Sequence, residues 1–472
     1  MGYTQTAGYR VNLSPCCGGF MKNIIISGAG EVGRYTAEVL QKRGHSITVI
    51  DTSFQALKRL DNVLDARLLQ GSACHGDVLE DAGVQDCDVF IAATNLDEIN
   101  FLTAAIAKKM GADKVIARIH HKTFHRNDNV NYGEVFGIDS LICPEELTAR
   151  AICAKLHDPG VAAVQRFAGE EIELHQFIVR HDSSAFHKPL KDLKLPPGTR
   201  IIIIRRGEQF VVPDKETVLA RGDIVTMVGP TKGYGDVKKM FEPHKKEHYE
   251  IVISGASATA EWILNEIDRR LYSIRLFEGN LERAEDFATR YPEITVLNAD
   301  PNESHVFEAE YLSEVSGFIS AGDSEEFNIL GSLQAKKNGV GTTFAVIHNS
   351  SHLSSLDGIG IDYPFSPRME GAKELLRLID DSSIKILASL EKGHVYVYEL
   401  QVAKGAAGAG KSLHEINFPR ATIVAAIQRE KKVIAPTPAD VIEEGDQLII
   451  MGPETMEKTL RKLFIQKKLW KN

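Results

Sequence analysis

The sequence predicts an α/β protein with two tandem Rossmann-like domains, each a doubly wound parallel sheet followed by a small α+β domain. The first observation is length, because 472 residues exceed what one ordinary core holds. The second is that short β-branched segments alternate with helical segments. The third is a repeat: residues 23–30 (NIIISGAG) return as residues 250–257 (EIVISGAS), and matched positions continue in register as far as Gly229 and Gly452.

The large part of the first copy alternates strands and helices in the order that builds a parallel sheet with helices on both faces. The order begins with a strand at 22–27, a helix at 31–43 and a strand at 47–50. Three more strands are predicted at 68–69, 89–93 and 114–119.

A smaller part that is rich in strands follows each large part. In the first copy its strands are predicted at 172–179, 200–205, 209–212 and 223–228. Helices over 144–157 and 367–379 are expected to link the two parts of each copy. The matching positions of the small parts are Pro, Gly and aliphatic, so these parts are interpreted as either a second ligand pocket or a dimer contact.

Composition excludes several classes of protein. Hydrophobic residues make up 43% and charged residues 25% of the chain, which is typical of a globular protein. The 64 acidic and 55 basic side chains give a net charge of −9, so no nucleic-acid partner is expected. No apolar stretch is long enough to span a bilayer. Six cysteines are too few for a disulfide framework and predict reduced thiols, which suit the cytosol: Cys16, Cys17, Cys74, Cys87, Cys143 and Cys153.

A glycine-rich turn opens the first predicted helix. It fits Gly-x-Gly-x-x-Gly and consists of Gly28, Ala29, Gly30, Glu31, Val32 and Gly33. The turn follows a strand, and Asp51 ends the next strand, which makes the pattern typical of a dinucleotide site. Gly30 lets a pyrophosphate approach the backbone and the helix start. Asp51 is placed to accept both ribose hydroxyls and would repel a 2′-phosphate, so the pattern favours NAD(H).

Other strand ends are expected to line the same crevice. Ser72 follows the third strand, Thr94 and Asn95 follow the fourth, and Arg118 lies in the fifth. Arg118 has two interpretations that the sequence leaves equal, a pyrophosphate contact and an ion pair with a helix. Glu31 would disfavour the extra charge of a triphosphate, which favours NAD(H) over ATP.

The second copy has lost part of this pattern. Its matching cofactor-binding candidates are Gly255, Ala256, Ser257, Ala258, Thr259 and Glu278. Ser257 replaces Gly30, Ala260 replaces Gly33 and Val346 replaces Arg118. The sequence predicts weaker or different binding there, either of an adenosine-type ligand or none.

The sequence predicts a regulatory protein rather than an enzyme, because neither copy leaves room for a substrate domain. His120, His121 and His125 are interpreted as part of a solvated basic helix rather than a metal site. No catalytic or metal-binding residue is assigned. An NAD-dependent oxidoreductase with a duplicated fold remains the alternative.

Several short motifs, in this order and in duplicate, resemble the TrkA family of bacterial potassium-uptake subunits, which carry two regulator-of-potassium-conductance units. They lie at 24–33, 51, 94–100, 116–119, 144–147 and 195–199. The resemblance implies a homotetramer whose eight nucleotide domains form a cytoplasmic ring. It also implies a TrkH-type membrane potassium channel subunit as the partner, with the ring attached to the inner face of the membrane.

The resemblance further implies that the ring binds NAD(H) and, in many members, ATP or ADP, and that nucleotide exchange gates potassium flux. Carried over to this sequence, 28–32, Asp51, Thr94, Asn95 and Arg118 form the first site. Glu145 matches a family acid that can meet a cation, and the second copy has Arg368 at that position. A sensing module for a different ion channel or exchanger is the other alternative.

Seven ranges follow from the repeat. They are a flexible extension (1–20), the first nucleotide-binding domain (21–143), a crossover linker (144–164), the first small β-rich domain (165–243), the degenerate second nucleotide-binding domain (249–366), a second linker (367–383) and the second small β-rich domain (384–466).

Overall fold

The computed structural model describes residues 21–61, 63–125, 130–157, 161–167, 172–207, 209–211, 213–231, 234–241, 248–349, 353, 356, 359–379, 383–390, 395–419, 422–430, 432–434 and 436–465. The predicted extension at 1–20, with Cys16 and Cys17, lies outside the described residues. So does most of the predicted join at 243–248.

The first large domain is a six-stranded parallel sheet in the order β3-β2-β1-β4-β5-β6. The strands are β1 (Asn23–Ser27), β2 (Ser46–Asp51), β3 (Arg67–Gln70), β4 (Val89–Ala92), β5 (Lys114–Arg118) and β6 (Ser140–Ile142). The helices between them are α1 (Glu31–Lys42), α2 (Phe54–Asp61), α3 (Gly76–Asp81), α4 (Asp97–Met110), α5 (Lys122–His125) and α6 (Tyr132–Phe136). The strand order reverses between β1 and β4, which is where ligands bind in such sheets.

The second large domain repeats this plan in the order β14-β13-β12-β15-β16-β17. Its strands are β12 (Tyr249–Ser254), β13 (Tyr272–Phe277), β14 (Thr295–Leu297), β15 (Gly317–Ser320), β16 (Thr342–Val346) and β17 (Tyr363–Phe365). Its helices include α9 (Ala258–Glu266), α10 (Leu281–Arg290), α11 (Ser304–Ala309) and α12 (Glu325–Lys337). The predicted fold class of two parallel-sheet domains is therefore confirmed.

A repeated Gly-Ile-Asp motif has a structural reason in both large domains. Asp139 accepts a hydrogen bond from Val115 N at 2.7 Å and pairs with Lys108 at 2.8 Å. Asp362 makes the matching contacts with Thr343 N at 2.9 Å and Lys336 at 2.8 Å. The motif anchors the fifth strand to the preceding helix, so it belongs to the fold rather than to a ligand site.

The two small domains are five-stranded antiparallel sheets that lie together in one compact unit. The first contains β7 (Val161–Phe167), β8 (Ile172–Ile178), β9 (Arg200–Arg206), β10 (Gln209–Val211) and β11 (Ile224–Pro230), with α8 (Tyr234–Phe241). The second contains β18 (Ile384–Leu390), β19 (Val395–Gln401), β20 (Ile423–Arg429), β21 (Lys432–Ile434) and β22 (Gln447–Gly452), with α15 (Glu457–Leu460). The predicted boundary between 164 and 165 falls within β7, and the predicted ranges remain predictions.

One face of each small sheet packs against the other. Leu174, Ile202 and Val228 of the first sheet share a buried cluster with residues of the second. Those residues are Val397, Ala425, Ala426, Ile449 and Met451. The sequence left a second ligand pocket and a dimer contact open for these domains. The structure shows a contact between the two copies within one chain.

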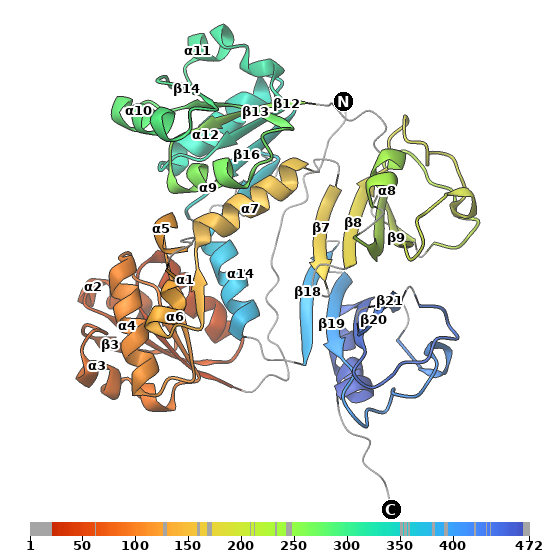
Figure 1. Ribbon diagram of the computed structural model, residues 1–472, viewed down its shortest axis with the longest axis horizontal. Coiled ribbons are helices and arrows are strands. Elements are labelled where there is room, and N and C mark those ends of the chain that lie inside the picture. Colours follow the sequence, from red (N-terminus) through yellow and green to blue (C-terminus); the bar gives the residue numbers. More distant parts are fainter. Residues whose placement is uncertain are drawn as a thin grey trace, which may run out of the picture. The chain divides into compact units, whose positions relative to one another are not determined.

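The two large domains form a second compact unit, in which each crossover helix packs on the other copy. The helix α14 (Pro367–Ile379) follows the large domain of the second copy but packs against α1 of the first (Figure 1). Its residues Leu375, Leu376 and Ile379 are buried in the core of the first domain. Lys22 and Lys114 of the first domain donate to the carbonyls of Ile379 and Leu378 at its last turn, at 3.0 and 2.6 Å.

The helix α7 (Pro144–His157) makes the reciprocal contacts with the second domain. Cys153 Sγ lies 3.9 Å from the Ile263 carbonyl oxygen of α9, and Arg150 lies 3.7 Å from Glu266. Both crossover helices have the bounds that the sequence predicts. The exchange between copies was not predicted, because helix periodicity shows which face is apolar but not which domain covers it.

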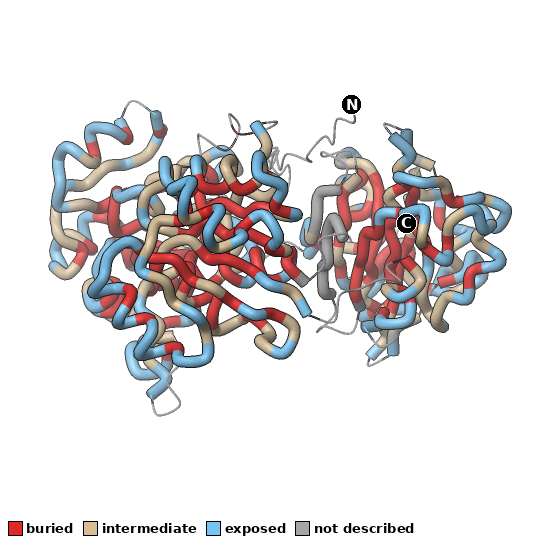
Figure 2. Tube along the Cα trace, turned by 90° about the horizontal axis from the view of Figure 1, so that it is seen from above, coloured by how far each residue is buried: buried red, intermediate tan, exposed pale blue. Residues whose placement is uncertain are grey.

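All residues of the central strands β4 and β15 are buried, and Figure 2 colours the buried residues of the chain red. Among the described residues no helix is both long and apolar enough to cross a membrane.

Candidate functional site

The turn between β1 and α1 requires glycine at two positions. Gly28 has φ +106°, which side chains rarely adopt, and a Cβ on it would lie 2.8 Å from the Ala93 carbonyl oxygen. A Cβ on Gly33 would lie 1.9 Å from the Gly28 carbonyl oxygen. Gly30 differs, because a Cβ there would meet nothing closer than Asn95 Oδ1 at 3.9 Å. The turn therefore leaves open space beside Gly30, where α1 begins.

The start of α1 has no side-chain cap. Gly30 is its N-cap residue and Glu31 and Val32 follow, so backbone N–H groups at this end have no side-chain acceptor. Free N–H groups at a helix start and the positive end of the helix dipole together attract anions. These features make the turn suitable for a phosphate group.

Asp51, the last residue of β2, organises this turn. One carboxylate oxygen accepts from Ala29 N at 2.6 Å and the other from Ser53 N at 2.7 Å. The carboxylate thus lies beside the glycine turn, at the carboxyl end of a strand, where the sequence places it. Ser72 lies just beyond β3, and its hydroxyl accepts from Cys74 N at 3.3 Å.

The opposite wall of the crevice follows β4 and is held by Asn100. Its side-chain oxygen accepts from Thr94 N at 2.8 Å and from the Thr94 hydroxyl at 2.7 Å. Its amide nitrogen donates to the carbonyls of Thr94 and Arg118 at 3.0 and 2.9 Å. Asn328 makes the same kind of bridge in the second copy, to Gly322 and Val346. The repeated asparagine that the sequence shows is therefore a positioning residue for the ends of the two strands.

Arg118 ends β5 and lies between the crevice and α7. Its guanidinium donates to Asn95 Oδ1 at 3.4 Å and to Glu145 Oε1 at 3.2 Å, whereas its buried Nε has no hydrogen-bond partner. The ion pair with a helix, one of the two interpretations of Arg118, is thus present. The contacts with Asn95 and Glu145 hold the guanidinium at the strand end, where it presents a positive charge.

Glu145 is a buried carboxylate at the start of α7. Burial opposes its charge, but the hydrogen bond from His120 and the charges of Arg118 and His120 outweigh burial and lower its pKa. His120 Nδ1 lies 3.2 Å from Glu145 Oε1, and this contact raises the pKa of His120 against the opposing effect of burial. Glu145 therefore stays charged and paired with protein groups, and the cation contact predicted for it stays a prediction.

The histidine cluster differs from its interpretation as a solvated basic helix. His120 pairs with Glu145, and His125 Nε2 lies 2.7 Å from Glu146 Oε2. The helix α5 has only four residues and contains His125 but neither His120 nor His121. That interpretation is wrong for His120 and His125, which lie against carboxylates of α7, whereas His121 is exposed. Within the part of the chain that the structure describes, no group of three or more His, Cys, Asp or Glu side chains is placed to hold a metal ion.

Glu31 is paired across the two copies. Its Oε2 lies 2.6 Å from Arg368 Nη1 of α14 and 3.3 Å from Arg34 Nη2 of its own helix. The sequence could not show the Arg368 contact, because the two residues are far apart in the chain. The available signal was the repeat, which places Arg368 at the position that Glu145 occupies in the first copy.

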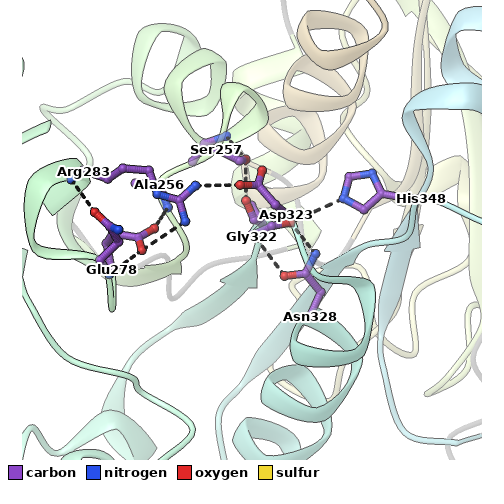
Figure 3. A network of polar contacts seen from close by, with 11 residues as sticks. Ala256, Ser257, Glu278, Arg283, Gly322, Asp323, Asn328 and His348 are labelled. Atoms are coloured by element: carbon purple, nitrogen blue, oxygen red, sulfur yellow. Dashed lines mark hydrogen bonds and ion pairs between the residues drawn. The ribbon is translucent and has the colours of Figure 1, made fainter. Parts of the chain in front are cut away.

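The second crevice keeps the turn but satisfies its polar groups internally (Figure 3). Ala256 N donates to Glu278 Oε2 at 2.8 Å, as Ala29 N does to Asp51. Ser257 caps α9 by accepting from Ala260 N at 3.3 Å, and its hydroxyl donates to the Ala321 carbonyl. The start of α9, with Ala258 and the buried Thr259, thus has an acceptor of its own.

A cation bridges the mouth of the second crevice. Arg283 of α10 lies 3.3 Å from Glu278 Oε1 and 2.6 Å from Asp323 Oδ2, which occupies the position of Asn95 (Figure 3). His348 Nε2 lies 3.4 Å from the Gly322 carbonyl oxygen. The carboxylate and Asp323 are thus joined by a cation here, and the helix start has a side-chain acceptor, whereas the start of α1 in the first copy has no side-chain cap. Sequence reasoning missed Arg283, because its match in the first copy, Ala56, has no polar group.

Two family models match the chain in tandem. The TrkA-N domain matches residues 24–144 and 251–367, and the TrkA-C domain matches residues 174–242 and 397–465. The chain belongs to the TrkA family. Membership agrees with the sequence prediction of a regulatory subunit rather than an enzyme.

TrkA relatives match along nearly all of their length. A "Trk system potassium uptake protein TrkA homolog 2" of Methanosarcina mazei is 27% identical, covering 94% of this chain and 100% of the relative. A TrkA homolog of Archaeoglobus fulgidus is 29% identical and covers 91% of this chain and 97% of the relative. TrkA of Haemophilus influenzae is 28% identical and covers 90% of this chain and 95% of the relative.

Solved structures share the TrkA-family fold. The "GsuK RCK domain" superposes with a TM-score of 0.61 at 17% identity and covers 98% of this chain and 97% of that one. The "GsuK channel bound to NAD" superposes with a TM-score of 0.62 at 17% identity, over 98% and 81%. At this identity the likeness establishes the fold alone.

Proposed function

We propose that this chain is a nucleotide-sensing regulatory subunit of a potassium uptake system and binds NAD(H) in its first crevice. The observation that carries the proposal is the open space beside Gly30, flanked by an uncapped helix start and the Asp51 carboxylate. A pyrophosphate needs the open space and the uncapped helix start, and a ribose needs the carboxylate. The names of the relatives support potassium uptake, and the NAD-bound GsuK channel supports the ligand.

The site residues divide into four roles. Gly28 to Gly33 provide the phosphate turn, and Asp51 binds the ribose. Thr94, Asn95 and Ser72 line the strand ends, and Arg118 supplies a cation to the pyrophosphate. ADP or ATP is the second ligand class, and a structure of GsuK bound to ADP is among the similar folds. The carboxylate of Glu31 favours a ligand without a terminal phosphate.

The assembly that we propose is a ring of eight large domains from four chains, under a TrkH-type membrane subunit at the cytoplasmic face. Exposed apolar side chains occur on the matching helices of the two copies. Leu102 of α4 is 46% exposed, and Leu330 at the matching position of α12 is 60% exposed, as is the nearby Phe327 at 58%. Paired apolar patches on a repeated helix suit contacts between copies of the chain.

The crossover helices suit the transmission of ligand occupancy. A ligand shifts an equilibrium only by contacts that differ between two states. Because α7 and α14 each pack on the other copy, a change at one crevice alters the packing of both large domains. The large domains would then move the ring that gates potassium flux.

The test is calorimetric titration of the purified chain with NADH. Asp51→Ala should weaken binding by about 100-fold, because two charge-assisted backbone contacts and the ribose contact are lost together. Glu278→Ala, the matched control in the second copy, should leave NADH affinity within about twofold, which is near the limit of such a comparison. Unchanged affinity in Asp51→Ala would remove the site assignment.

Co-purification with a membrane potassium subunit tests the proposed partner. Robust hydride transfer from NADH would instead support the oxidoreductase alternative.

A further inference from the structure

The ion pair between Glu31 and Arg368 joins the phosphate turn of the first copy to the second copy. Glu31 directly follows Gly30, the residue beside which the turn is open. Arg368 is the second residue of α14, and its side chain is only 15% exposed, whereas Glu31 is 54% exposed. A mostly covered guanidinium from one copy is therefore held against the rim of the anion-attracting turn of the other.

Several contacts anchor the helix that carries Arg368. This helix is anchored in the core of the first domain by Leu375, Leu376 and Ile379 and is capped by Lys22 and Lys114. The helix α14 therefore cannot separate from α1 without exposing these apolar side chains to water. The packing of α14 on the first domain therefore sets the position of Arg368 beside the turn.

The electrostatic surroundings of Arg368 come from both sides of the first crevice. Burial lowers the pKa of Arg368, Glu31 opposes this, and Arg34 and Arg118 add to it, while Glu325 of the second copy opposes it. Arg34 is on α1 and Arg118 on β5, so three guanidinium groups lie near the turn. Clustered cations repel one another unless anions lie among them, and a bound pyrophosphate would supply such charge.

We infer that Arg368 is a phosphate ligand supplied by the second copy to the first nucleotide site, with Glu31 as its holder when phosphate is absent. This inference rests on the proposed function and adds a group to that site. Negatively charged phosphate oxygens compete with the Glu31 carboxylate for one guanidinium. Ligand binding is thereby linked to the contact between α14 and α1, which is the contact that joins the two copies.

The roles of the two copies are then complementary. The second copy has its own crevice bridged by Arg283, yet it provides the first copy's turn with a further cation, Arg368. At the equivalent place on α7 the first copy has Glu145, which pairs within its own domain.

The experiment is a double-mutant cycle on NADH and ADP affinity in the full-length chain, with Arg368→Gln, Glu31→Gln and the pair. Arg368→Gln should weaken both ligands by about 10-fold, the effect of one charge-assisted contact. Glu31→Gln should strengthen both by about threefold, because the competing carboxylate is gone. The Glu31 effect should vanish when Arg368 is already Gln.

Controls separate folding from recognition. Arg377→Gln changes an exposed arginine of the same helix that pairs with Glu374, and it should leave affinity unchanged. Arg368→Lys keeps the charge and should recover part of the lost affinity, and it also serves if Arg368→Gln does not fold. Loss of NADH binding in Asp51→Ala with unchanged binding in Arg368→Gln would overturn this inference and leave the proposed function intact. Absence of NADH and ADP binding in the unmodified chain would overturn both.

Discussion

The two large domains have the same fold and different crevices. Both place a glycine with positive φ after the first strand, at Gly28 and Gly255, and both end the second strand beside a carboxylate that accepts from the turn. They differ in what meets the helix start. Gly30 leaves it open, whereas Ser257 caps it.

This comparison shows that the fold of the turn and its capacity to bind are separate properties. The carboxylate and the positive-φ glycine organise the turn in both copies, so their presence alone does not demonstrate a ligand site. Binding capacity depends on polar groups that the protein leaves without a partner. In the second copy Ser257 accepts from the start of α9, and Arg283 pairs with the Glu278 carboxylate. Through α14 the second copy also places Arg368 against Glu31 of the first turn.

The largest effect is expected at Gly33, where the copies differ by one methyl group. Gly33→Ala would place Cβ 1.9 Å from a backbone oxygen that cannot move without breaking the turn. We expect the free energy of unfolding of the large domains to fall by about 3 kcal/mol. Urea unfolding measures it.

The reverse change at the matching position is the control. Ala260→Gly removes a methyl group within a helix and should cost about 1 kcal/mol. Equal costs for the two substitutions would show that the turns of the two copies do not differ in packing.

The second crevice offers a gain-of-function test. Ser257→Gly combined with Arg283→Ala removes the cap and the bridge, so the helix start and Glu278 become available. We expect the stoichiometry of NADH binding to rise from one to two per chain. The new site should be about 10-fold weaker than the first, because Val346 stands where Arg118 supplies a cation.

Two outcomes of that titration would contradict the comparison. The unmodified chain could already bind two NADH molecules with equal affinity, which would show that Ser257 and Arg283 do not close the crevice. Alternatively, the stoichiometry could stay at one although the variant unfolds like the unmodified chain. Groups other than Ser257 and Arg283 would then prevent the second crevice from binding NADH.

The smallest effect concerns pH at the His120–Glu145 pair, which the second copy lacks. The pKa of His120 is raised above its ordinary value of 6.5 by the hydrogen bond to Glu145, so the folded state binds this proton more tightly than the unfolded state. The contribution to stability is therefore complete below pH 6.5 and is lost as pH rises through the folded-state pKa. It should be less than about 1 kcal/mol, because the His120 side chain is 42% exposed and water screens the pair.

Unfolding by urea at pH 6 and pH 8.5 measures this contribution in the unmodified chain and in His120→Asn. The unmodified chain should lose more stability than the variant over this interval. His348→Asn is the matched control, since that ring faces the carbonyl oxygen of Gly322 instead of a carboxylate. An identical pH dependence in His120→Asn would show that the pair contributes nothing.

The sequence by itself determined the duplicated fold, the glycine turn, Asp51 and the bounds of both crossover helices. These features depend on local patterns: alternation of strands and helices, a positive-φ glycine, and a carboxylate at a strand end. The repeat also revealed Asn100 and Asn328, although only the structure showed that they hold the strand ends together.

The tertiary structure alone decided which groups from distant segments meet. The packing of α14 on the first domain, the pairing of Arg368 with Glu31 and the bridge from Arg283 to Asp323 join residues with no fixed spacing in sequence. Periodicity records which face of a helix is apolar, but a core of either copy can cover that face. The choice is made by packing and charge across the whole pair of domains, and this is why the cation at the first turn comes from the second copy.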